Sequence, residues 1–131
     1  MPRAIIYTRI SQDRNGEGAG VARQETDARA LATARGWSIT DVVVDNDISA
    51  KGHKTRPGFE RLLQAVESGS VQVVIAWALD RLTRNRRDTL RLIETCQKQG
   101  ATIALVRGSD LDMSTPAGRL TADLLAAVAR S

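Results

Sequence analysis

The chain has 131 residues, which is enough for one domain with a hydrophobic core and too few for two. Hydrophobic residues make up 42% of it, yet no apolar run approaches the ~18 residues that a membrane span needs, so we expect a cytoplasmic protein without a membrane partner. The net charge of +4 comes from 16 arginines against 3 lysines, a balance that permits a polyanionic partner without demonstrating one.

Strand and helix patterns alternate along the chain. In chain order we expect a strand at 3–9, a helix at 20–36, a strand at 38–47, a helix at 56–69, a strand at 71–80, a helix at 86–100, a strand at 101–108 and a helix at 114–131. Gly36, Gly69 and Gly100 stand where three of these helices end, as helix-closing glycines do. The alternation predicts an α/β fold, in which a mainly parallel sheet of four to five strands lies between helices in three α/β/α layers.

A single cysteine and a single histidine limit the chemistry. Cys96 has no partner for an internal disulfide, and its place in the predicted helix 86–100 indicates a small core residue. With His53 as the sole histidine, a zinc site of the His/Cys type lacks ligands.

Polar residues follow the predicted strands at their carboxyl ends. Because the carboxyl ends of parallel strands meet at one edge of a sheet, where open α/β sheets bind ligands, this edge is the candidate site. In strand order the residues are Ser11; Asp45, Asp47 and Ser49; Asp80 and Arg81; Arg107 and Asp110.

The densest basic cluster is "LDRLTRNRRD", residues 79–88. A helical turn there would place Arg81 and Arg84 on one face. Arg86 and Arg87 open the next predicted helix, where positive charge is unfavourable unless an anion is bound, and phosphate is such an anion. The alternative is a solvated basic surface.

Tyr7, Arg9 and Ser11 occupy alternate positions of "IIYTRISQD" and therefore point to one side of a strand. The chain has no G-x-S-x-G sequence, which argues against an α/β-hydrolase. Attack of Ser11 on a phosphodiester fits the residues, since arginines can neutralise the developing charge and Asp80 can orient an arginine or relay a proton. Alternatively, Ser11 only forms a turn.

The chain resembles the catalytic domain of the serine recombinases, the resolvase and invertase group, and most of all large serine integrases and transposases. The resemblance covers essentially the whole sequence. It is carried by four stretches in order: "YTRIS" (7–11), "GVARQETDARALATARGW" (20–37), "DNDISAKGHKTRPGFERLL" (45–63) and "LDRLTRN" (79–85).

The resemblance implies that Ser11 is the nucleophile and forms a covalent phosphoserine link to DNA, releasing a 3′-hydroxyl that later reverses the attack after strand exchange. It implies no cofactor: neither ATP nor a metal is required. The remaining implied site residues are Arg9, Arg81 and Arg84 around the scissile phosphate, Asp80 as their acidic partner, and Tyr7, Gln24 and Arg56 in support. Arg86 and Arg87 lie just outside the matched motif and are expected to bind DNA phosphates.

The resemblance also implies partners: double-stranded DNA, and further copies of the protein in a homodimer and tetramer, with no small-molecule substrate. It implies that residues 1–131 form an N-terminal catalytic domain that ends inside its last long helix, without DNA-binding domains. The fragment is then not expected to recombine DNA alone. Its last helix carries an apolar stripe, Leu120, Leu124, Ala127 and Val128, which is either sunk in its own domain or shared between subunits.

Two other functions stay open at this point. Gly16, Gly18 and Gly20 suggest a nucleotide-binding loop, although Val21 breaks the G-x-G-x-x-G spacing. The same arginines would also suit a non-catalytic DNA-binding module, which would bind DNA with steep salt dependence and leave no covalent adduct.

Overall fold

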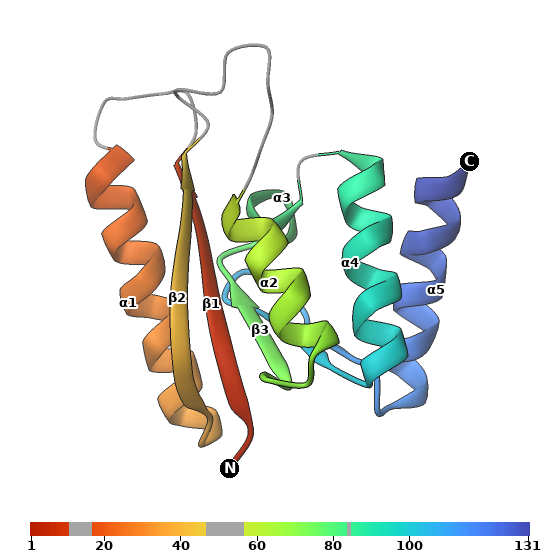
Figure 1. Cartoon of the computed structure of the whole chain (residues 1–131), viewed down its shortest axis with the longest axis horizontal. Helices are drawn as coiled ribbons and strands as arrows, with labels where there is room; N and C mark the ends of the chain where they lie inside the picture. Colours follow the sequence, from red (N-terminus) through yellow and green to blue (C-terminus); the bar gives the residue numbers. More distant parts are fainter. Residues whose placement is uncertain (11–16, 47–56, 84) are drawn as a thin grey trace.

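The computed structural model describes residues 1–10, 17–46, 57–83 and 85–131. Its centre is a five-stranded sheet of order β2-β1-β3-β4-β5, in which the first four strands are parallel and β5 pairs antiparallel with β4 (Figure 1). The strands are β1 (Arg3–Ile10), β2 (Ser38–Asn46), β3 (Val73–Ala76), β4 (Thr102–Leu105) and β5 (Leu111–Asp112). The helices are α1 (Glu17–Arg35), α2 (Pro57–Glu67), α3 (Leu79–Leu82), α4 (Arg86–Gln99) and α5 (Pro116–Arg130).

The predicted three-layer α/β fold is confirmed, with α1 on one face of the sheet and α2, α4 and α5 on the other. Several details of the elements differ from the prediction. The third strand is shorter than 71–80, because the chain leaves the sheet after Ala76 and turns into α3. The fourth strand is shorter than 101–108, because it ends at Leu105. The two-residue strand β5 was not predicted. Gly18 and Gly20 lie inside α1 and not in a strand-to-helix loop, which removes the basis for a nucleotide-binding loop.

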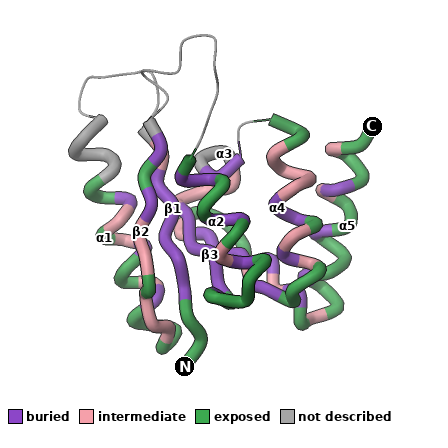
Figure 2. The backbone as a smooth tube through the Cα atoms, viewed as in Figure 1, coloured by how far each residue is buried: buried purple, intermediate pink, exposed green. Residues whose placement is uncertain are grey.

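Strand β1, which lies between β2 and β3, is buried along most of its length (Figure 2). Its side chains alternate between two cores. Ile5 and Tyr7 pack toward α2 and α4, whereas Ala4 and Ile6 pack toward α1. Cys96 is fully buried in the larger core, as predicted, and its burial raises the pKa of the thiol to about 12. The sheet therefore provides a rigid base from which β1 presents its carboxyl end.

Helix α5 lies on the domain through small residues. Gly118, Ala122 and Ala126 are buried, and a Cβ at Gly118 would come within 2.0 Å of the Asp112 carbonyl oxygen, so only glycine permits this approach. The opposite side carries the exposed residues Leu120, Leu124 and Val128, with exposed fractions of 61%, 59% and 65%. The interpretation of α5 as a helix sunk entirely in its own domain is therefore wrong. None of the helices in the described ranges combines the length and apolar character that a bilayer span requires.

Candidate active site at the carboxyl edge of the sheet

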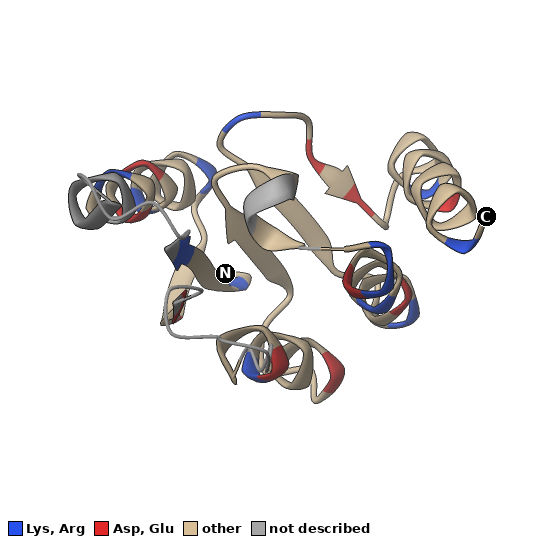
Figure 3. Cartoon of the chain, turned by 90° about the horizontal axis from the view of Figure 1, so that it is seen from above, with Lys and Arg blue, Asp and Glu red and all other residues tan. Residues whose placement is uncertain are grey.

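The carboxyl ends of β1, β2 and β3 meet at the predicted edge (Figure 3). Arg9 is half-buried near the end of β1 and is paired in the sheet register with Asp45 of β2. Helix α3, which contains the backbone of Asp80 and Arg81, begins three residues after β3 and packs against β1. The structure thus brings these segments together. The side chains of Asp80 and Arg81, and all of Ser11, Arg56 and Arg84, lie outside the described residues, as do Asp47 and Ser49.

A buried carboxylate joins this edge to α2. Asp45 is 2% exposed, and its Oδ2 accepts hydrogen bonds from the Tyr7 hydroxyl (2.7 Å) and the Phe59 backbone N–H (2.9 Å). Its Oδ1 accepts from the Gly58 backbone N–H at 2.7 Å. Asp45 therefore caps the N-terminus of α2 from a neighbouring strand, where the helix dipole favours negative charge.

The contacts of Asp45 account for the glycine at position 58 and for the tyrosine at position 7. Sequence reasoning left the role of Asp45 open, because a cap supplied from another element has no local spacing signal. A Cβ at Gly58 would lie 2.8 Å from Asp45 Oδ1, so the glycine permits the short contact. Tyr7 stacks edge-on against Phe59, with ring centroids 6.2 Å apart, and its hydroxyl is committed to Asp45. That geometry makes Tyr7 part of the packing between β1, β2 and α2.

Gln24 is a buried polar residue of α1. It is 6% exposed, one turn before the buried Ala28, and among the described residues its Oε1 atom has no hydrogen-bond partner. Because α1 begins at the carboxyl edge and descends along the sheet, Gln24 lies in the half of the helix nearer that edge (Figure 1). A buried amide oxygen without a donor costs about 1–3 kcal/mol, which marks this position as one that packing alone does not explain.

The basic cluster spans two helices. Helix α3 ends at Leu82 and Thr83 is extended (φ −117°, ψ 147°), so the helical turn that carries Arg81 ends before Arg84, whose own placement lies outside the described residues. Arg86 and Arg87 are exposed in the first turn of α4, whose N-cap Asn85 accepts a hydrogen bond from the Asp88 N–H at 2.8 Å. Arg86 donates from Nη1 to the Ser131 carbonyl at 2.7 Å.

Asp110 does not belong to this edge, contrary to the sequence expectation. After β4 the chain reverses into the antiparallel strand β5, and Asp110 forms an ion pair with Arg35, the last residue of α1, at 2.6 Å. Arg107 stays near the ends of the parallel strands, and its backbone N–H donates to the Trp77 carbonyl at 2.7 Å.

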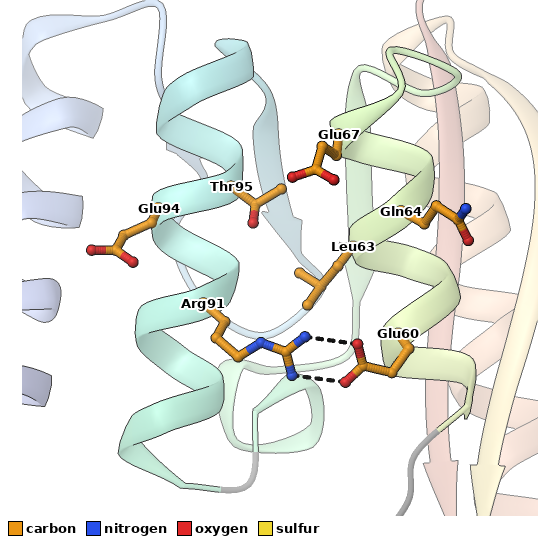
Figure 4. A pocket seen from close by; sticks show the side chains of 7 residues that line it. All are labelled: Glu60, Leu63, Gln64, Glu67, Arg91, Glu94 and Thr95. Atoms are coloured by element: carbon orange, nitrogen blue, oxygen red, sulfur yellow. Dashed lines mark hydrogen bonds and ion pairs between the residues drawn. The ribbon is translucent and has the colours of Figure 1, made fainter.

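A separate cleft of about 510 Å³ lies between α2 and α4 (Figure 4). Arg91 crosses it and binds Glu60 through two hydrogen bonds of 2.7 Å, and this carboxylate raises the pKa of the guanidinium. Glu67 and Glu94 also line the cleft, but the described residues there include no nucleophile beside a base, and nowhere do they include three His, Cys, Asp or Glu side chains grouped to hold a metal. The Arg91–Glu60 ion pair across this cleft links α4 to α2.

Comparison with known proteins agrees with this geometry. Residues 4–131 match the family model "Resolvase, N terminal domain". The chain is 30% identical over 130 residues to the Transposon Tn2501 resolvase of Escherichia coli, covering 98% of this chain and 62% of that protein. It is 36% identical over 81 residues to a DNA-invertase of Enterobacteria phage P7, covering 61% of this chain and 42% of that protein. The chain thus spans less than two thirds of the length of these curated relatives.

Solved structures give the same result. The N-terminal catalytic domain of TP901-1 integrase superposes with a TM-score of 0.76 at 30% identity, covering 96% of this chain and 92% of that one. A resolvase family site-specific recombinase from Streptococcus pneumoniae superposes with a TM-score of 0.81 at 27% identity, covering 99% and 87%.

Proposed function

Because the chain belongs to the resolvase N-terminal domain family, we propose that it is the catalytic domain of a site-specific recombinase that cleaves and rejoins double-stranded DNA through Ser11. The family match over residues 4–131 carries the proposal. It is supported by the position of Arg9 at the edge where β1 leads into Ser11.

In the proposed reaction the Ser11 Oγ attacks the phosphorus of a DNA phosphodiester. A phosphoserine bond forms, the bond from phosphorus to O3′ breaks, and the proton lost by the serine is balanced by the proton that the released 3′-hydroxyl gains. Arg9, Arg81 and Arg84 neutralise the phosphoryl oxygens in the transition state. Asp80 orients this cluster or relays the proton. The 3′-hydroxyl of an exchanged strand then reverses the step, so the bond energy is kept in the ester.

Two observations support the assigned helpers. The Tyr7–Asp45 contact ties the end of β1 to both β2 and α2, which limits how far Arg9 can shift. Gln24 keeps its Oε1 atom buried near the same edge without a hydrogen-bond partner among the described residues. An active-site role for Gln24 would offset the free-energy cost of burying that atom. Arg56 is also proposed to support the active site. Arg86 and Arg87, exposed at the start of α4, are proposed to bind flanking phosphates.

The exposed stripe of α5 is the proposed contact between copies of the protein. Leu120, Leu124 and Val128 follow each other at helical spacing, so they form one continuous apolar strip. Burying a leucine or valine side chain fully is worth about 1.5–3 kcal/mol, enough to favour association. We infer a homodimer, and a tetramer during strand exchange, in the cytoplasm where the DNA lies.

The proposal is tested by trapping the intermediate. The longest natural form of the protein would be incubated with DNA that carries its site, selected from a randomised duplex pool. We expect a complex that resists detergent and disappears with protease. Ser11→Ala should abolish it, whereas the control Ser68→Ala, an exposed serine beyond the end of α2, should not. DNA binding with no adduct in the wild type would instead favour the non-catalytic DNA-binding module.

A further inference from the structure

Arg107 lies outside the four stretches that carry the family resemblance, yet it follows the sheet at the same level as Arg9. Tyr7, Ala76 and Leu105 are aligned across β1, β3 and β4, and Arg9 and Arg107 each follow two residues later. Neighbouring strands are about 4.8 Å apart, so the two backbone positions are about 10 Å apart along the edge. That separation places Arg107 beside the candidate site.

The backbone holds Arg107 in place although β4 has ended. Two hydrogen bonds tie the segment after β4 to the end of β3: the Val106 N–H donates to the Ala76 carbonyl (3.0 Å) and the Arg107 N–H to the Trp77 carbonyl (2.7 Å). Gly108 then takes a φ of 141°, which favours glycine and turns the chain toward β5. Arg107 is therefore fixed at the last position before the turn.

The Arg107 side chain is exposed and charged, and it stacks on a tryptophan. The guanidinium carbon lies 5.7 Å from the centroid of the half-buried Trp77 ring, and among the described residues no carboxylate forms an ion pair with it. Stacking on an aromatic ring restricts the guanidinium before binding, so less conformational entropy is lost when an anion binds. The N–H donors lie in the plane of the guanidinium and can still donate to an anion. Arg35, which also stacks on a tryptophan, is by contrast paired with Asp110.

We propose that Arg107, held over Trp77, binds a backbone phosphate of the DNA that flanks the cleaved phosphodiester. The inference rests on the proposed function for the identity of the anion. Guanidinium groups bind phosphate oxygens through paired N–H donors, and a contact on the backbone adds affinity and register without reading the sequence. Arg107 is a binding and positioning residue and takes no part in the proton transfers.

The test measures the salt dependence of binding to a 30-base-pair duplex, with every variant in a Ser11→Ala background so that cleavage plays no part. One phosphate contact changes the slope of log K against log salt concentration by about 0.9. When the salt concentration rises from 50 to 200 mM, the factor by which the DNA affinity falls should therefore be about 3.5-fold smaller for Arg107→Ala than for its parent. Lys98→Ala, which removes an equal charge from the last turn of α4, should keep the parent slope, and Arg107→Lys should restore it.

A second readout follows the tryptophan. In a Trp37→Phe background Trp77 is the sole tryptophan, and its emission should change on titration with the duplex and stay constant in Arg107→Ala. A slope in Arg107→Ala equal to that of Lys98→Ala would overturn the proposal. It would also fail if the parent did not bind the duplex, or if Arg107→Ala altered only self-association. The covalent adduct assay decides the proposed function separately.

Discussion

Replacing Asp45 tests whether the edge of the sheet is held by the buried carboxylate. Asp45→Ala leaves three buried donors without their acceptor: the Tyr7 hydroxyl and the N–H groups of Gly58 and Phe59. An unsatisfied buried donor costs about 1–3 kcal/mol, so for three donors the variant should lose about 3–9 kcal/mol of unfolding free energy. Asp45→Asn keeps one acceptor oxygen and loses the charge at the helix N-terminus, and should lose about 2–4 kcal/mol.

Urea denaturation followed by circular dichroism gives these free energies. Tyr7→Phe should cost about 1.5–3 kcal/mol, and its effect should shrink when Asp45 is already asparagine, since the two side chains share one hydrogen bond. Asp41→Asn is the matched control on the same strand, because Asp41 pairs with Arg61 at the surface and should contribute under about 1 kcal/mol. An Asp45→Asn variant as stable as the Asp41→Asn control would refute the capping role.

Single substitutions also probe α5, the core and the turn after β5. Gly118→Ala should destabilise the fold by about 1–3 kcal/mol in urea denaturation, because its Cβ would collide with the Asp112 backbone. Leu124→Glu should weaken self-association in sedimentation equilibrium without lowering stability, and an unchanged association constant would remove α5 from the interface. Since the buried Cys96 thiol has its pKa raised from 9.0 to about 12, the unfolded chain ionises first, so stability should fall between about pH 9 and 12, and less so in Cys96→Val. Ser114 lowers the pKa of Asp112 by hydrogen bonds from its side chain and backbone, so Ser114→Ala should raise that pKa in an NMR titration. The stability that Ser114→Ala removes is present above the ordinary pKa of an aspartate and is lost as the pH falls through the lowered pKa of Asp112.

The sequence predicted the parts of the fold that depend on local patterns. Apolar periodicity located all four parallel strands and the long helices, and Gly36, Gly69 and Gly100 have the positive φ expected of helix-closing residues. The end of β3 was missed, because the apolar residues that follow it continue the strand pattern into α3. Strand β5 was missed because two residues carry no periodic signal.

The sequence predicted the edge of the sheet at which the candidate site lies, but not the contacts that hold this edge in place. The carboxyl edge follows from β-α alternation, and Arg9 lies there. The cap that Asp45 provides joins residues thirteen and fourteen positions apart, so no short motif announces it. Asp110 was misplaced because the reversal into β5 depends on tertiary pairing with β4, which local sequence does not encode.

If Ser11 forms the bond to DNA, mass spectrometry of the trapped complex should find the nucleotide on that side chain. After nuclease digestion and trypsin, peptide 10–14 should carry a nucleotide attached through its 5′-phosphate to the Ser11 side chain. The Ser11→Ala protein should yield the unmodified peptide. A nucleotide on any other residue, or DNA cleavage by the wild type with peptide 10–14 unmodified, would contradict the claim.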